Sequence, residues 1–244
     1  MSIELTNLWE EGFIPHHSWT PTNTKLQWWS SDSLENFETT SNNRYNKNSI
    51  IYNFNNYGYR SIDIDLTDQT SKILCVGCSI TFGVGLPEDE IWPTHIQSSF
   101  SKYKVYNLGV AGASPDTVAR ILTNSCLALT PDIVLILWPS KSRYETYQDR
   151  SKGFISPHGP WNLSKHNIEM FDEMQLYNQF EKNKLIVRLL KDKYKFNLIE
   201  FEADKITTKT KNSILARDMQ HPGAETHQLI SKMFTDSINA NTTL

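Results

Sequence analysis

From Ser71 onward, the sequence alternates short apolar runs with longer amphipathic stretches. This alternation is typical of a parallel β-sheet with helical crossovers, because parallel strands cannot be joined by a tight hairpin. The apolar runs predict strands at residues 72–77, 103–108, 132–138 and 196–201. The amphipathic stretches predict helices at residues 88–100, 114–129, about 167–193 and about 221–238, with Ser114 and Pro115 suited to a helix start. The pattern therefore predicts one α/β domain.

The first 60 residues differ from the rest in composition and pattern. They are rich in Asn, Ser, Thr and aromatic residues and follow no clear period. We expect residues 1–60 to form an irregular extension in front of a domain spanning residues 61–244. Because exposed aromatic side chains are costly, much of the extension should pack on the domain or bind a protein partner. Trp28 and Trp29 could instead stack on sugar rings, although such aromatic residues more often anchor a segment to its own domain.

Composition excludes several classes of protein. The formal net charge of −3 gives no general attraction to nucleic acid or to an anionic membrane. No apolar run approaches the roughly 18 to 20 residues that span a bilayer, and the first residues do not resemble a signal peptide. We therefore expect a cytoplasmic protein, with assembly into a larger particle left open. The three cysteines, Cys75, Cys78 and Cys126, are expected to be thiols, and neither a metal nor a cofactor is indicated.

Glycine-rich turns follow the first two predicted strands. In open parallel sheets, ligands bind beyond the carboxyl ends of the strands. The turn after the first strand, residues 77–85, would expose the hydroxyl of Ser79 at that edge. The turn after the second strand, residues 107–114, contains Gly112 and leads into a helix. The amides of Ser79 and Gly112 are therefore candidate donors to a negatively charged reaction intermediate.

A carboxylate and an imidazole lie close together near the carboxyl end of the chain. Asp218 precedes His221 by three residues, just before the last predicted helix. A serine hydroxyl becomes nucleophilic only when a base takes its proton, and the base works best when a third group orients it. Ser79, His221 and Asp218 are the candidates for these three roles.

Other interpretations of the first turn remain open at this stage. Its glycines could hold a phosphate group, although the turn lacks the Lys-Ser/Thr ending of a P-loop. Cys78 could be the nucleophile in place of Ser79, since an ionised thiol is more reactive than a hydroxyl. The Cys75–Cys78 spacing could also indicate a redox or zinc site, but the sequence has no second cysteine pair to complete one.

The stretches KILCVGCSITFGVGLPEDEIWP, VYNLGVAGASPDT and DMQHPG, in this order, resemble the first, second and last blocks of the SGNH (GDSL-type) hydrolases. The resemblance covers roughly residues 50–235. It implies a flavodoxin-like, three-layer α/β/α fold with a central parallel sheet. It also implies that Ser79 is the nucleophile, that His221 is its base and that Asp218 orients the base.

Two positions depart from the pattern of that family. Cys78 replaces the aspartate that precedes the nucleophile, and the third block, after residue 138, lacks its asparagine. Ser140 could supply the third oxyanion donor, and Arg143 could meet an anionic or sugar-linked substrate. The resemblance implies a serine esterase acting on a small acyl ester, such as an O-acetyl group on a carbohydrate. The alternative is a binding or structural module that keeps the fold without the activity. Residues 141–166 show no period and are expected to form a loop over the carboxyl edge of the sheet.

Overall fold

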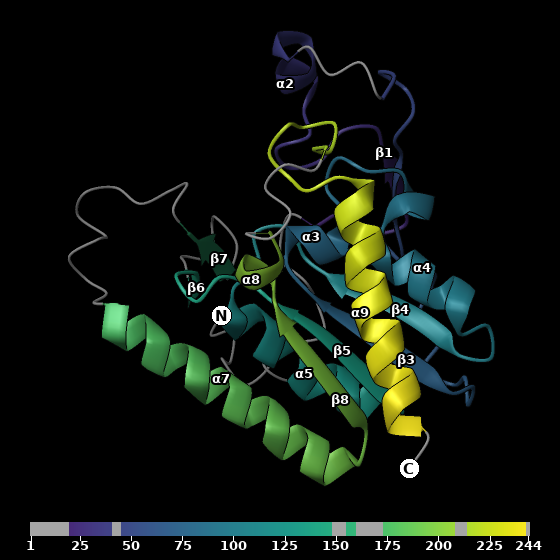
Figure 1. Ribbon diagram of the computed structural model, residues 1–244, viewed down its shortest axis with the longest axis vertical. Coiled ribbons are helices and arrows are strands. Elements are labelled where there is room, and N and C mark those ends of the chain that lie inside the picture. Colours follow the sequence, from purple (N-terminus) through teal and green to yellow (C-terminus); the bar gives the residue numbers. More distant parts are fainter. Residues whose placement is uncertain (1–19, 41–44, 148–154, 160–172, 208–213, 243–244) are drawn as a thin grey trace, which may run out of the picture.

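A four-stranded parallel sheet forms the centre of the computed structural model, which describes residues 20–40, 45–147, 155–159, 173–207 and 214–242 (Figure 1). The strand order is β4-β3-β5-β8. The strands are β3 (Lys72–Gly77), β4 (Lys104–Gly109), β5 (Ile133–Trp138) and β8 (Asn197–Glu202). All four predicted strands are confirmed to within one residue. The chain runs from β3 to β4 on one side and then to β5 on the other, so the connections diverge beyond the carboxyl end of β3.

Helices cover both faces of this sheet. α4 packs against α9, and α5 packs against α7, so that two helix pairs enclose the strands (Figure 1). The bounds are α4 (Trp92–Ser99), α5 (Pro115–Leu129), α7 (Glu173–Tyr194) and α9 (Ala224–Thr242). Strands β3 and β5 are buried along their whole length, as strands covered on both faces must be. The predicted three-layer α/β/α fold is therefore confirmed.

Local sequence signals explain where the helices begin. Ser114 caps α5, accepting a hydrogen bond from the amide of Thr117, whose side chain bonds back to the Ser114 amide. Pro115 occupies the first turn of α5, as predicted. Pro93 lies in the first turn of α4, which therefore begins only after Ile91. The stretch predicted as one helix at 88–100 is instead a 3₁₀ turn, η1 (Glu88–Glu90), followed by α4.

The structure corrects two other predictions. The expected loop at 141–166 contains an antiparallel pair, β6 (Tyr144–Tyr147) with β7 (Ile155–His158), while residues 148–154 and 160–166 lie outside the described residues. A buried ion pair between Glu145 on β6 and Arg120 on α5 attaches this pair of strands to the domain. The last helix begins at Ala224 and not near residue 221, because the preceding residues close into a loop. Of the helix expected from about residue 167, residues 167–172 lie outside the described part.

Residues 20–60 contribute to the hydrophobic core. They contain β1 (Thr24–Leu26), α2 (Leu34–Thr39) and β2 (Tyr52–Phe54), and β1 pairs with β2. Side chains from residues 45–54 join others from residues 82–91 and 216 in a second core cluster, which includes Phe82 of the short helix α3 (Ser79–Phe82). The ribbon of β1 and α3 lies beyond the carboxyl end of the sheet (Figure 1). The buried members of the cluster are Tyr45, Ile50, Tyr52, Phe54, Phe82, Val84, Leu86, Ile91 and Ala216. Residues between 26 and 54 thus pack against the helix that follows β3. The remaining described helix, α8 (Ala203–Thr207), follows β8 directly.

The cysteines are thiols, as predicted, and all three, Cys75, Cys78 and Cys126, are buried. Burial raises the pKa of Cys126 to about 12 and the pKa of Cys75 well above its usual value. Within the described part of the chain, no helix is both long and apolar enough to cross a membrane.

Replacing His227 should flatten the acid side of the stability profile. His227 is buried near the start of α9, and its Nδ1 accepts a hydrogen bond from the Trp92 amide at 3.1 Å. Burial, together with the positive charge of nearby His95, His221 and Arg60, lowers the pKa of His227 to about 3. Between about pH 6.5 and 3 the unfolded chain binds a proton that the folded chain excludes, so stability falls by up to about 1.4 kcal/mol per pH unit.

His227→Asn keeps an acceptor near the position of Nδ1 but does not titrate. Urea unfolding at pH 4 to 8 should therefore give a shallower loss of stability for this variant than for the wild type. Parallel stability curves for the two proteins would contradict the assignment.

Candidate active site

Ser79 is the first residue of α3, directly beyond the carboxyl end of β3. The last residues of β3 and β4, Gly77 and Gly109, have no room for a side chain. A Cβ on Gly77 would lie 2.2 Å from Thr81 Oγ1, and one on Gly109 would lie 2.4 Å from the Phe82 amide nitrogen. These glycines let α3 sit directly on the ends of the two strands. The space beside them is filled by the helix, which does not favour an open phosphate cradle. The turn instead fixes the position of the Ser79 hydroxyl.

Asp218 and His221 lie in a loop that is closed at its base. The Gly223 amide donates to the Ile214 carbonyl at 3.0 Å, and the Ala216 amide donates to the His221 carbonyl at 2.9 Å. A Cβ on Gly223 would meet the Ile214 carbonyl oxygen at 2.3 Å, so this close crossing of the chain requires glycine. The closed base projects Asp218 and His221 toward the end of β3.

Ser79, His221 and Asp218 form a continuous chain of contacts. Ser79 Oγ lies 2.8 Å from His221 Nε2, and His221 Nδ1 lies 2.5 Å from Asp218 Oδ2. Since a carboxylate can only accept, Nδ1 carries the proton, and Nε2 is left to accept the Ser79 proton. The three side chains that sequence analysis selected therefore meet in the order that nucleophilic catalysis needs.

The Asp218 carboxyl is buried but well supplied with donors. Oδ1 accepts the amides of Gln220 at 3.1 Å and His221 at 3.0 Å, and Oδ2 also accepts the hydroxyl of Ser31 at 2.7 Å. Burial raises the pKa of this carboxyl, but the hydrogen bonds from His221 and Ser31 outweigh burial and hold the pKa below its usual value. Asp218 therefore stays ionised next to the imidazole.

A buried ion pair holds the loop that carries Asp218 against the segment around Asp32. Arg217 donates from Nε and Nη2 to the two carboxylate oxygens of Asp32, at 2.8 and 2.6 Å. Both side chains are essentially inaccessible, at 0% and 1% exposure. Arg217 also donates to the carbonyls of Gln27 and Lys47, and its guanidinium lies 4.1 Å from the ring of Trp28. The described N-terminal residues therefore surround the side chain next to Asp218.

The same N-terminal region orders the turn that follows Ser79. Tyr52 donates its hydroxyl proton to Asp32 and accepts the Gly85 amide at 2.9 Å. Arg60, fully buried, donates to the carbonyls of Gly83 at 2.6 Å and Leu86 at 2.8 Å. These contacts do not involve Cys78, which stands where the SGNH hydrolases have an aspartate. The turn that follows Ser79 is ordered by residues that sequence analysis did not select.

Gly85 joins the two halves of the site. It has a φ of +77°, and a Cβ there would meet Ala216 Cβ at 2.8 Å. Its carbonyl accepts the Arg217 amide at 2.9 Å. The turn that follows the nucleophile thus contacts the backbone of the Asp218 loop directly, which fixes the distance between Ser79 and His221.

The other predicted site residues lie after the neighbouring strands. Gly112, with a φ of +81°, is in the turn between β4 and α5, where the Ala113 amide bonds the Val110 carbonyl. Ser140 follows β5, and its hydroxyl lies 3.0 Å from that of Ser142. Arg143 reaches the Ala113 carbonyl at 3.4 Å, which places it beside the Gly112 turn. These residues share the carboxyl edge with Ser79, and their roles remain predictions.

The geometry does not support the alternative sites involving cysteine. The side chain of Cys78 is 2% exposed and belongs to the main hydrophobic cluster, whereas the Ser79 hydroxyl contacts His221. In the described residues, no group of three His, Cys, Asp or Glu side chains is arranged to hold a metal ion.

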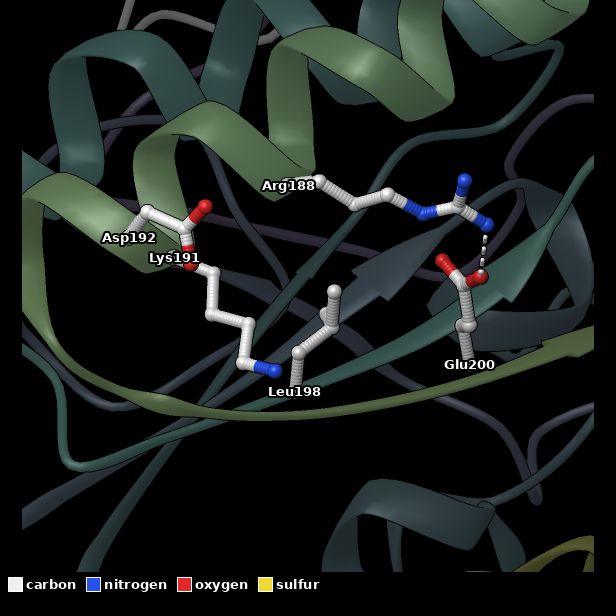
Figure 2. A pocket seen from close by; sticks show the side chains of 5 residues that line it. All are labelled: Arg188, Lys191, Asp192, Leu198 and Glu200. Atoms are coloured by element: carbon white, nitrogen blue, oxygen red, sulfur yellow. Dashed lines mark hydrogen bonds and ion pairs between the residues drawn. The ribbon is translucent and has the colours of Figure 1, made fainter.

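An open groove between α7 and β8 lies elsewhere on the domain (Figure 2). It has a volume of about 380 Å³ and is lined by Arg188, Lys191, Asp192, Leu198 and Glu200. Arg188 and Glu200 pair across it at 3.5 Å. Its lining has charged side chains of both signs and no serine, cysteine or histidine. Ser79 therefore remains the candidate for the nucleophile.

Neither a protein-family model nor a curated protein matches this sequence. Similar solved structures include the psychrotrophic esterase EstA from Pseudoalteromonas sp., at 17% identity and a TM-score of 0.40, covering 71% of this chain and 100% of that one. A lipolytic protein of the G-D-S-L family from Veillonella parvula is 14% identical with a TM-score of 0.36, and the match covers 66% of this chain and 94% of that one. The lipase/acylhydrolase from Enterococcus faecalis is 13% identical with a TM-score of 0.38, and the match covers 70% of this chain and 96% of that one. Likeness this distant carries no argument about activity, which has to be argued from the geometry of the site.

Asp32→Asn should destabilise the protein strongly. The substitution leaves the buried Arg217 guanidinium without its counter-charge, a change that typically costs about 3 to 5 kcal/mol. Glu38→Gln is the matched control, because Glu38 lies in the same segment but pairs with Lys47 on the surface, where ion pairs contribute little. Urea unfolding at neutral pH should separate the two variants clearly. Equal, small losses in both would show that the buried pair does not hold the segment in place.

Proposed function

We propose that this chain is a serine hydrolase that cleaves small acyl esters through an acyl-enzyme. One observation carries the proposal: Ser79 Oγ lies 2.8 Å from His221 Nε2, and His221 Nδ1 lies 2.5 Å from the buried carboxylate of Asp218. A serine bonded to a neutral imidazole whose far nitrogen is held by a carboxylate is the arrangement that activates a hydroxyl at neutral pH.

The first half of the reaction transfers the acyl group to the enzyme. Ser79 Oγ attacks the ester carbonyl carbon while its proton moves to His221 Nε2. The tetrahedral intermediate then collapses, and His221 gives the same proton to the departing alcohol oxygen. Asp218 stabilises the imidazolium that exists between these two transfers, without itself taking the proton.

The negative oxygen of the intermediate needs donors that are already in place. We assign this role to the amides of Ser79 and Gly112. Ser79 is the first residue of its helix, so its amide has no acceptor within that helix. The positive φ of Gly112 supports a tight turn at the same sheet edge. Ser140, which stands where the third family block would place its asparagine, is the candidate for a third donor.

Water completes the second half of the reaction. His221, neutral again, takes a proton from a water molecule that attacks the acyl carbon, and Ser79 Oγ leaves with that proton. The partly exposed His221 side chain, at 18%, is accessible to that water.

The substrate is proposed to be a small O-acyl ester, with an O-acetyl group on a carbohydrate as the first candidate. The resemblance to the SGNH hydrolases suggests this class. Arg143, beside the Gly112 turn, is the candidate to contact an anionic or sugar-linked part of the substrate. No nucleic acid, membrane or cofactor takes part in the proposed reaction.

Ser79→Ala should abolish ester hydrolysis. We expect at least about a thousandfold loss in the rate of p-nitrophenyl acetate hydrolysis at neutral pH, because removing the nucleophile of such a triad costs at least this much. A fluorophosphonate probe should label the wild type at Ser79 and leave the variant unlabelled. Cys78→Ala is the matched control: the thiol is buried in the core, so this variant should keep both hydrolysis and labelling.

Other outcomes would contradict the proposal in different ways. Equal hydrolysis by the wild type and Ser79→Ala would exclude Ser79 as the nucleophile, and loss in Cys78→Ala alone would assign the reaction to the thiol. Absence of hydrolysis and labelling in the wild type, with acetylated glycans also left intact, would favour the non-catalytic binding module.

A further inference from the structure

We propose that Ser31, from the N-terminal region, is a positioning residue of this active site: its hydroxyl orients Asp218 and shares the negative charge that the carboxylate offers to His221. The inference rests on the function proposed above and deepens it. It assigns part of the site to Ser31, which lies outside the three sequence blocks that contain Ser79, Gly112 and His221.

Hydrogen-bond chemistry fixes the direction of this contact. Ser31 Oγ lies 2.7 Å from Asp218 Oδ2, the same oxygen that His221 Nδ1 contacts, and 3.5 Å from Nδ1 itself. Because Nδ1 carries a proton, the Ser31 hydroxyl must donate to the carboxylate. Oδ2 therefore receives two side-chain donors, and Oδ1 receives two amides.

Ser31 is held in position by its own turn. The backbones of Trp29 and Asp32 bond each other reciprocally, at 2.9 and 3.2 Å, and Ser30 between them has a φ of +60°. The Ser31 carbonyl accepts the side-chain amide of Asn36 at 2.6 Å. This turn is then fastened to the Asp218 loop by the ion pair of Asp32 with Arg217. The hydroxyl thus has little freedom to leave the carboxylate.

Removing this donor should change how strongly Asp218 holds the protonated base. With one hydrogen-bond donor fewer, the Asp218 carboxylate has more negative charge available to His221. It should therefore stabilise the imidazolium more and raise the pKa of His221. Among the described residues, the other ionisable groups around this loop include the pair of Arg217 with Asp32, and Arg60, His95 and His227, and a substitution at Ser31 leaves them in place. A displaced pH profile would therefore report the hydroxyl itself.

The test compares three substitutions by steady-state kinetics on p-nitrophenyl acetate from pH 5 to 9. In Ser31→Ala, we expect about a tenfold loss of kcat and an acid limb that moves up by about half a pH unit, with KM little changed. Ser31→Thr, which keeps the hydroxyl, should restore both. Ser33→Ala is the matched control, because Ser33 only caps α2, through the Asn36 amide. It should keep the wild-type pH profile.

A second readout separates failure of this inference from failure of the proposed function. The histidine resonances, with His221 assigned by their loss in His221→Asn, can be titrated by NMR without any turnover. If the wild type neither hydrolyses ester nor reacts with the fluorophosphonate, the proposed function fails, yet an upward shift of the His221 pKa in Ser31→Ala would still support the Ser31 contact. The inference is overturned if Ser31→Ala titrates like the wild type, or if Ser31→Thr is as impaired as Ser31→Ala.

Discussion

The buried ion pair of Asp32 with Arg217 is the interaction on which the candidate site depends. A guanidinium can be buried only if an opposite charge and hydrogen bonds replace its contacts with water. For Arg217, Asp32, two backbone carbonyls and the face of the Trp28 ring provide them. Because Arg217 directly precedes Asp218, the contacts that hold the Arg217 side chain also fix the position of the Asp218 carboxylate. Ser31 and Asp32, adjacent in sequence, bind Asp218 and Arg217, which are also adjacent.

The ordering of the nucleophile turn follows from the same region. Cys78 has a thiol where the SGNH pattern has a carboxylate, and its side chain is committed to the core. Arg60 and Tyr52 bind the backbone that follows Ser79 and hold it from the other side. A hydrophobic residue before the nucleophile is compatible with an ordered site when the stabilising contacts come from elsewhere in the chain.

Sequence analysis predicted the sheet well because its strands carry a strong local signal. Runs such as KILCVG and IVLILW are apolar on both faces, and only a covered strand accommodates that. Ser79, Asp218 and His221 could be selected because turn chemistry and the three-residue spacing are also local. The partners Ser31, Asp32, Tyr52 and Arg60 could not be selected. Their contacts reach across up to 187 positions and leave no periodic trace, and one hint was a density of aromatic residues too high for a free tail.

The separation of Asp32 from Arg217, 185 positions, also bears on how the molecule forms. Closing a loop of that length costs about 4 to 5 kcal/mol of chain entropy, which the contacts inside the site must offset. On a ribosome, the early segment is synthesised long before the arginine that it encloses. The sheet can therefore assemble from contacts between neighbouring elements, while the contacts around Ser79 form only after residues 217–221 have been synthesised. A chain interrupted before residue 217 would contain Ser79 but neither Asp218 nor His221, so it would lack two of the three side chains of the proposed triad.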